Sequence, residues 1–328
     1  MSNLLIGLLG ALVATNQPVA VSNLVLRSTG VSISVPDPND PVEKELQKVM
    51  DEDDAAQAEV DRWIRENDEF AAKGAGTPPA QLKRRIQQRF EPVRKAYEDF
   101  LERHPNNTRA RVAFASFLGD TKDEESAEEQ LEKALAIDTN SPAIYNNLAN
   151  IYGHIGPVAK AFEFYGKAIQ LNPLEPVYYH NLGTTVYLFR NDAMEFYKIN
   201  LPQVFAKTFE LYSNAMRLDP DNFPLASDVA QTYYGVQPLR TDEALQAWTN
   251  ALHIAHDEIE REGVYVHFAR LKLLAGRFDE ARAHLNSLTN EMYGELRNRL
   301  TRNLNEKEAA AKTNAAPSLP KAGDAPPK

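Results

Sequence analysis

The fold is decided by residues 142–175, which read PAIYNNLANIYGHIGPVAKAFEFYGKAIQLNPLE. Apolar and small residues of this stretch recur in the neighbouring sequence at a distance of thirty-four positions. The repeated set pairs Tyr145, Leu148 and Ala149 with Tyr179, Leu182 and Gly183, and Ala127, Leu131 and Ala134 with Ala161, Tyr165 and Ala168. A period of this length is typical of a solenoid of stacked helical hairpins. Such a stack offers a surface to partners and brings no reaction chemistry of its own.

The residue types within the period have clear packing roles. Small residues permit close helix crossings, aromatic residues fill the gaps between successive hairpins, and Pro173 ends the second helix. In this pattern the chain resembles the tetratricopeptide repeat family. The matching residues of the best unit are Tyr145, Leu148, Ala149, Tyr152, Ala161, Tyr165, Ala168 and Pro173.

We predict an all-α fold in which residues 108–292 form a tetratricopeptide-type solenoid of about five helix-turn-helix repeats. The predicted units are 108–141, 142–175, 176–221, 222 to about 257, and 258 to about 292. In the third unit Pro173 is followed by Pro220 only after forty-seven residues, so we expect an insertion between Arg190 and Phe205. In the fourth unit Gln237-Pro238 predicts a longer turn.

Helical patterns flank the repeats. Residues 42–107 predict a helical hairpin that starts at the cap Asp40 and Pro41 and is interrupted at residues 74–79. Residues 293–308 predict an amphipathic capping helix, and residues 309–328, which lack periodicity, predict a disordered tail.

The N-terminal segment, residues 1–41, leaves two interpretations open. Its apolar run Leu4 to Ala14 is long enough for the core of a signal peptide and too short to span a bilayer. No Lys or Arg precedes the run, and Pro18-Val19-Ala20 is a poor cleavage site. Alternation around Val31-Ser32-Ile33-Ser34-Val35 favours an extended arm instead. The cytoplasm is therefore favoured over export, and a membrane association is expected only through this segment.

The composition and the absence of certain motifs argue against several classes of function. With 328 residues, 43% hydrophobic content and a formal net charge of −10, the chain is predicted to be folded and not to bind nucleic acid. Cysteine is absent, which excludes disulfides, thiolate metal sites and cysteine nucleophiles. The sequence has no phosphate-binding loop, nucleophile elbow or dinucleotide fingerprint, so we expect no enzyme and no cofactor.

The candidate peptide-binding residues lie on the first helices of the units. Asn147 and Asn181 occupy equivalent positions one repeat apart, and Asp228 and His267 take that position in the fourth and fifth units. In tetratricopeptide proteins that grip extended peptides, the resemblance implies an asparagine ladder that pairs with the peptide backbone. The full predicted set is Asn147, Asn150, Asn181, Tyr187 and Asp228. The alternative is that these asparagines cap or bridge helices locally.

One specific ligand of the family is not expected. Repeats that clamp the C-terminal carboxylate of heat-shock chaperones use two asparagines, which Asn150 and Asn181 match, and three basic side chains. The positions of the basic side chains fall on Asn146, Pro224 and Asp228, so the charge that holds a carboxylate is missing.

The insertion is rich in aromatic residues. Phe196, Tyr197 and Phe205 have no packing role in the repeat pattern, so we predict a hydrophobic docking patch, with burial against their own loop as the alternative.

The predicted function is noncatalytic protein binding or scaffolding, in which the concave side of the repeats holds a peptide or helix of unknown identity. One alternative is an accessory or metal-binding subunit that uses His253 and His256 with Asp257 and Glu260, although polar side chains on the closing turns of a repeat more often simply face water. Another is a self-associating component of the cell envelope.

Overall fold

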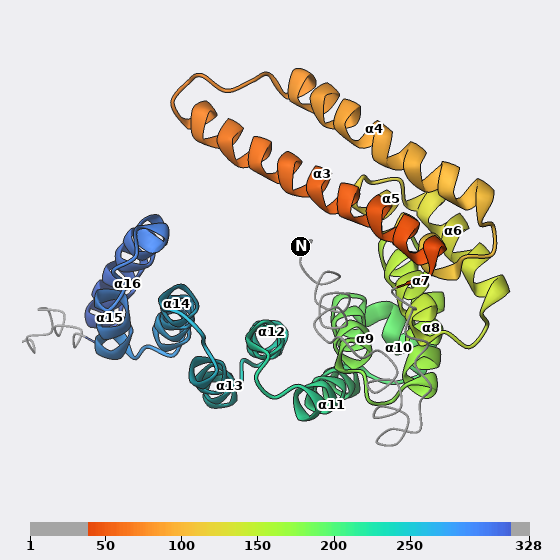
Figure 1. Ribbon diagram of the computed structural model, residues 1–328. Helices are drawn as coiled ribbons and strands as arrows, with labels where there is room; N and C mark the ends of the chain where they lie inside the picture. Colours follow the sequence, from red (N-terminus) through yellow and green to blue (C-terminus); the bar gives the residue numbers. More distant parts are fainter. Residues whose placement is uncertain (1–38, 316–328) are drawn as a thin grey trace, which may run out of the picture. The chain divides into compact units, whose positions relative to one another are not determined.

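The computed structural model describes residues 39–315, and every regular element in that range is a helix (Figure 1). The chain divides into two compact units, Met1–Ile199 and Asn200–Lys328. The division falls within the third predicted repeat. The predicted arm at residues 1–38 and the end of the predicted tail, residues 316–328, lie outside the described residues.

The first unit begins with a long helical hairpin. Helix α3 (Pro41–Ala72) starts at Asp40, whose Oδ1 accepts a hydrogen bond from the backbone N–H of Val42 at 2.9 Å. The predicted cap is thereby confirmed, with Pro41 in the first turn, where no backbone donor is needed. Gly74 follows the helix with a φ of +77°, a conformation that glycine adopts at little cost. The chain then reverses into α4 (Pro79–Arg103).

Aromatic residues join this hairpin to the first repeat. Tyr97 of α4 stacks on Phe114 of α5 (Thr108–Asp120) with ring centroids 5.2 Å apart. Both side chains are buried. The second half of α4 therefore packs as the second helix of a repeat does.

Two regular hairpins follow. The first pairs α5 with α6 (Glu124–Ile137), and the second pairs α7 (Pro142–Ile155) with α8 (Val158–Leu171). The small and aliphatic residues that define the sequence period are buried here: Ala127, Leu131, Ala134, Leu148, Ala149, Ala161 and Ala168. Their predicted packing role is confirmed.

The insertion begins with a short extra helix. After α9 (Pro176–Leu188), helix α10 (Arg190–Tyr197) packs against α8 and α9 through the buried Ala193. It ends at Lys198, which adopts a left-handed conformation. The predicted position of the insertion, between Arg190 and Phe205, is confirmed.

The second unit opens with a reciprocal cap. The side chain of Asn200 accepts from the backbone of Gln203, and the Gln203 side chain accepts from the backbone of Asn200, so α11 (Leu201–Leu218) begins with a capping box.

Two hairpins continue this unit. The first pairs α12 (Phe223–Thr232) with α13 (Thr241–His253), and the second pairs α14 (Glu258–Leu274) with α15 (Phe278–Asn286). The longer connection predicted at Gln237-Pro238 holds a 3-10 turn, η1 (Tyr233–Gly235), and residues 236–240.

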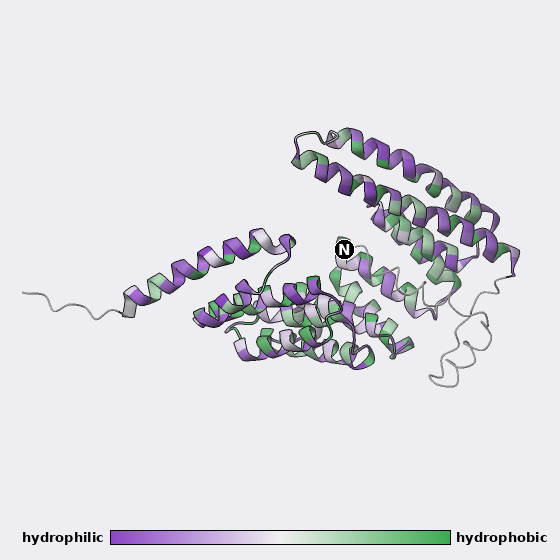
Figure 2. Ribbon diagram, turned by 60° about the vertical axis from the view of Figure 1, so that its left-hand side comes forward, coloured by the Kyte–Doolittle hydropathy of each residue, from purple (hydrophilic) through white to green (hydrophobic). Residues whose placement is uncertain are grey.

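The last elements are the 3-10 turn η2 (Glu291–Tyr293) and α16 (Gly294–Ala315), which packs on α14 and α15 through the buried Leu300 and Leu304. Figure 2 shows how largely hydrophilic this helix is. The prediction that the helix ends at 308 and disorder begins at 309 is wrong for residues 309–315. Alanine at 309–311 has high helix propensity, and Lys312 pairs with Glu308 one turn earlier at 2.7 Å, so the helix continues.

None of the helices within residues 39–315 is long and apolar enough to cross a membrane.

Candidate functional site

A chain of three asparagine amides connects neighbouring repeats of the first unit. Asn181 of α9 donates from Nδ2 to Oδ1 of Asn146 on α7 at 3.0 Å, and Asn146 donates in turn to Oδ1 of Asn147 at 3.3 Å. Asn146 is only 6% exposed, whereas Asn147 and Asn181 are partly exposed. The buried amide therefore fixes the orientation of two more accessible ones.

Asn150, one turn further along α7, is held by a different partner. The hydroxyl of Tyr165 on α8 donates to Oδ1 of Asn150 at 2.6 Å. Burial raises the pKa of Tyr165 to about 12, so this hydroxyl keeps its proton and remains a donor at neutral pH. This bond fixes the oxygen of Asn150. The Asn150 side chain is partly exposed, and the bond to Tyr165 does not use its two amide hydrogens.

The three amides retain hydrogen-bonding capacity. An asparagine side chain offers two N–H donors and two acceptor lone pairs, and the bonds described use one position on Asn181 and one each on Asn147 and Asn150. Donors and acceptors of this kind alternate along a peptide backbone, and α7 and α9 present them side by side. Chemically, this surface is suited to hydrogen bonding with an extended chain.

Not all of the predicted residues join this surface. Tyr187 lies near the end of α9, where the guanidinium of Arg190 covers its ring at 4.9 Å from the centroid. Asp228 lies on α12 of the second unit, where its backbone oxygen accepts from the Thr232 hydroxyl at 2.9 Å. The structure thus brings together Asn147, Asn150 and Asn181 within the first unit, whereas Asp228 belongs to the second.

The equivalent position in the fifth unit serves packing. His267 of α14 stacks on Trp248 of α13, with ring centroids 3.9 Å apart and ring planes inclined by 11°. Its Nδ1 lies 3.2 Å from the Tyr234 hydroxyl. Burial and the neighbouring Arg270 lower the pKa of His267 to about 4, so the imidazole is neutral at physiological pH. His267 belongs to an aromatic cluster in the interior of its unit.

The three residues of the predicted aromatic docking patch are divided between the two units. Phe196 and Tyr197 both pack on the buried Phe162 of α8, with ring centroids 5.3 Å and 5.4 Å away. Phe205 lies in the other compact unit and is only 6% exposed. The expectation of an exposed patch is therefore wrong for Phe205, because this α11 side chain gains more by covering adjacent apolar surface than by facing water, whereas Phe196 of α10 remains 41% exposed.

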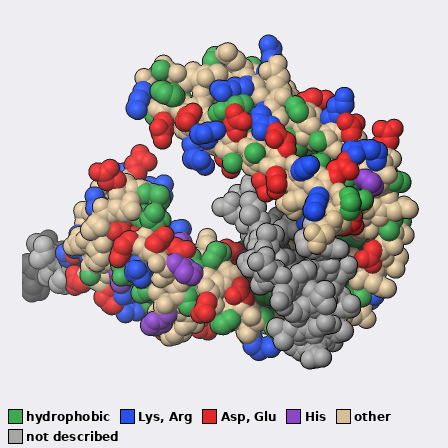
Figure 3. All heavy atoms as spheres, in the orientation of Figure 1, with side chains coloured by type: hydrophobic (Ala, Val, Ile, Leu, Met, Phe, Trp, Pro, Cys, Tyr) green, Lys and Arg blue, Asp and Glu red, His purple; other side chains and the backbone are tan. Residues whose placement is uncertain are grey.

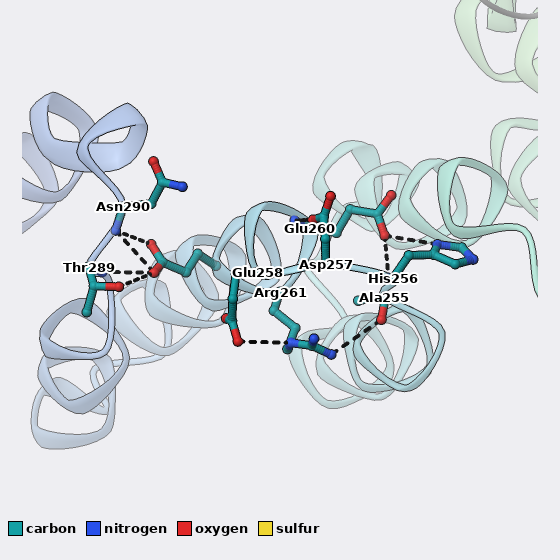
Figure 4. Close-up of polar contacts among 9 residues, drawn as sticks. Ala255, His256, Asp257, Glu258, Glu260, Arg261, Thr289 and Asn290 are labelled. Carbon is teal, nitrogen blue, oxygen red and sulfur yellow. Dashed lines mark hydrogen bonds and ion pairs between the residues drawn. The ribbon is translucent and has the colours of Figure 1, made fainter.

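Three residues of the predicted polar group, His256, Asp257 and Glu260, form hydrogen bonds with one another at the start of α14. Asp257 accepts from the backbone of Glu260 at 2.8 Å at the start of α14, and Glu260 accepts from His256 through both the backbone (2.7 Å) and the ring (3.1 Å) (Figure 4). Within residues 39–315 no three His, Asp or Glu side chains converge in a way that suits a metal ion. The metal-binding alternative thus gains no support from the geometry.

Two important polar residues were not recognised from the sequence. The repeat pattern gives Asn146 no binding or structural role, although this residue forms the central link of the amide chain. Glu262 of α14 is 3% exposed, and it accepts hydrogen bonds from Thr289 and Asn290 (Figure 4). The sequence does contain a signal that Glu262 is buried. This residue precedes the buried Val266, Ala269 and Leu273 at the spacing of one helix face.

Comparisons with known proteins agree with this architecture. Residues 108–141 and 142–173, which comprise α5 to α8, match the tetratricopeptide repeat family model. No curated protein sequence matches the chain. Among solved structures, the chain is similar to PilW, a type IV pilus biogenesis factor, at 14% identity over 70% of this chain and 91% of that one, with a TM-score of 0.50.

Two further solved structures are similar with lower TM-scores. Pseudomonas aeruginosa PilF is 18% identical over 78% of this chain and 99% of its own, with a TM-score of 0.48. YrrB, described as a tetratricopeptide protein with an unusual peptide-binding site, is 16% identical over 59% of this chain and 90% of its own, with a TM-score of 0.42.

Repeats of this family generally mediate protein-protein interaction and are typically noncatalytic. The periodicity, the stacked hairpins and the family match together identify α5 to α8, residues 108–173, as tetratricopeptide repeats.

Proposed function

We propose that the first unit binds an extended peptide along α7 and α9, and that the protein acts as a noncatalytic scaffold. The observation that carries the proposal is the amide chain Asn181–Asn146–Asn147, in which a buried asparagine orients two accessible ones. Preorganised donors and acceptors lose little conformational entropy when a ligand binds.

The mechanism is recognition of the peptide backbone. Side chains of Asn147, Asn150 and Asn181 exchange hydrogen bonds with peptide N–H and C=O groups, which are the same for every residue except proline. The net contribution of each such bond is about 1 kcal/mol, so backbone pairing alone supports modest affinity and broad sequence tolerance. This behaviour suits a scaffold that assembles several partners.

A displayed library of random peptides, selected on the full chain, tests the proposal. The selected peptides are then titrated by calorimetry against wild type, the Asn147→Ala/Asn181→Ala double variant, and Asn106→Ala as a matched control on an exposed asparagine of the same unit. Loss of two hydrogen bonds predicts an affinity lower by about tenfold or more for the double variant only.

A second measurement separates backbone from side-chain recognition. Methylation of single backbone nitrogens in a selected peptide is expected to weaken binding at alternate positions, while most side-chain replacements are tolerated. Equal affinity of wild type and the folded double variant, as judged by circular dichroism, would show that peptides bind elsewhere.

A further inference from the structure

The α3–α4 hairpin has two halves of different character. Near α5 the hairpin has a true core, in which Leu46, Val93 and Phe100 are fully buried. Beyond Val60 the situation changes, because no residue from 61 to 88 is buried. The distal half of the hairpin therefore lacks a covered interior.

Apolar side chains nevertheless line this distal half. They are Trp63, Ile64 and Phe70 on α3 and Leu82 and Ile86 on α4. Ile64 is 39% exposed and Phe70 is 55% exposed. One face of Trp63 is covered by the guanidinium of Arg85 at 3.7 Å from the ring centroid. Two helices alone cannot enclose an apolar seam, and such seams are ordinarily closed by a third or fourth helix.

The charges on the two helices are complementary. Residues 51–72 of α3 contain nine Asp or Glu and two Arg, whereas residues 79–90 of α4 contain four Lys or Arg and no acid. Within the hairpin this complementarity is used at Arg89, which pairs with Glu52 at 2.8 Å and Glu59 at 2.7 Å.

Other charges of the distal half remain available for a partner. Lys83 and Arg84 on α4, and Glu66 and Glu69 on α3, are exposed and form no ion pair with any residue between 39 and 315. Figure 3 shows acidic, basic and hydrophobic side chains together on the surface of the hairpin.

We propose that the distal hairpin is a self-association surface for a second copy of this chain. In a two-fold pair, the acidic α3 of each copy packs on the basic α4 of the other, so that each opposite-charge contact is made twice. Ile64, Phe70 and Leu82 then enter the interior of a four-helix bundle. This pairing involves neither α7 nor α9 and is independent of peptide binding.

The expected dimer is weak. About twelve residues of each helix extend beyond the core, a length of about 18 Å, which is too short for a standard stable interface. The full chain should therefore show a reversible, concentration-dependent equilibrium between monomer and dimer, which weakens as salt screens the exposed charges.

Sedimentation velocity of the full chain over a concentration series tests this surface. The double variant Ile64→Glu/Phe70→Glu replaces exposed side chains and should remain folded and monomeric. Leu274→Glu in the second unit, where Leu274 is 53% exposed, is the matched control and should dimerise as wild type does. A wild-type monomer at all concentrations, or a dimer that persists in the double variant, would overturn the proposal.

Charge exchange tests the identity of the occupant. The variants Lys83→Glu/Arg84→Glu and Glu66→Lys/Glu69→Lys should each be monomeric, because both inter-copy contacts become repulsive. An equimolar mixture should dimerise, since each contact then joins opposite charges again. A mixture that stays monomeric, with both variants folded by circular dichroism, would refute the pairing of α3 with α4 and indicate a partner other than a second copy.

Discussion

Nδ2 of Asn181 lies 3.0 Å from Oδ1 of Asn146, and this bond joins α9 to α7 across the boundary between two repeats. Because Asn146 is only 6% exposed, its end of this hydrogen bond is shielded from water. Amide pairs in such positions specify how adjacent hairpins stack, because each buried partner is costly to leave unpaired.

Removal of either asparagine is expected to destabilise the first unit. Asn181→Ala should lower the free energy of unfolding by about 1–3 kcal/mol, because it leaves the buried Oδ1 of Asn146 unpaired. Loss of the same bond in Asn146→Ala should cost less, because the partly exposed Asn181 that remains can bond to water. A double-mutant cycle in urea, followed by circular dichroism, should give a coupling energy of about 1 kcal/mol. Strictly additive effects would mean that the pair makes no net contribution.

Asp53 makes the α3–α4 hairpin sensitive to pH. Burial raises the pKa of Asp53 from 3.8 to about 6, although the Tyr97 hydroxyl donates to its Oδ2 at 2.9 Å. Since the folded pKa exceeds the unfolded value, the stabilising contribution of this group is complete below pH 3.8 and is lost as pH rises through 6.

Asp53→Asn, which retains an acceptor for Tyr97, should therefore be more stable than wild type by about 1–3 kcal/mol above pH 7 and nearly equal to it near pH 4. Thermal unfolding at several pH values measures this difference. Asp68→Asn on the exposed surface of the same helix is the control. A stability difference between Asp53→Asn and wild type that is independent of pH would contradict the shifted pKa.

His267 gives the stability of the second unit the opposite dependence on pH. Burial and Arg270 lower its pKa from 6.5 to about 4, so the folded state resists protonation. The contribution of neutral His267 to the free energy of unfolding is fully present above pH 6.5. It is lost as pH falls through 4, by up to about 3 kcal/mol. The loss should be smaller in His267→Gln. Titration of the His267 ring protons by NMR checks the cause, and a midpoint near 6.5 would exclude it.

Glu262 anchors the connection between α15 and η2. Burial acts to raise its pKa, but hydrogen bonds from Thr289 and Asn290 outweigh this effect and lower it below 4.5. Glu262→Gln places an amide donor against the N–H groups of this connection and should cost about 1–3 kcal/mol.

The matched control is Glu258→Gln, because Glu258 lies on the same helix and makes only an exposed contact with Arg261 at 3.5 Å. Amide hydrogen exchange at Thr289 and Asn290 should accelerate in Glu262→Gln and not in the control. Unchanged protection there would mean that the carboxylate does not hold the connection.

Local signals in the sequence were sufficient to predict most of the helices. Asp40 and Pro41 predicted the start of α3, and the period of alanine and aromatic residues predicted the buried faces of α5 to α8. Each of these signals depends on residues close in the chain, where backbone geometry alone determines which side chains share a face. The extension of α16 to Ala315 was missed because alanine and charge at 308–312 support a helix without an apolar stripe.

The candidate site was predicted only in part. Equivalent positions in the repeat pointed to Asn147 and Asn181, but the direct partner of Asn181 is Asn146, one position away. Periodicity reports which residues have equivalent backbone positions, and it does not report which rotamers meet across two helices.

By itself the sequence determined the all-α class, the hairpin repeats and their family, because a thirty-four-residue period can bury its apolar faces only by stacking. Only the tertiary structure decided which partner each buried polar group binds: Asn146 with Asn181, Tyr97 with Asp53, and Glu262 with Thr289. It also decided that the chain divides at Ile199 and that, among residues 39–315, no side chain from 61 to 88 on the distal α3–α4 hairpin is buried. These outcomes depend on contacts between residues far apart in the chain, whose energies no local pattern encodes.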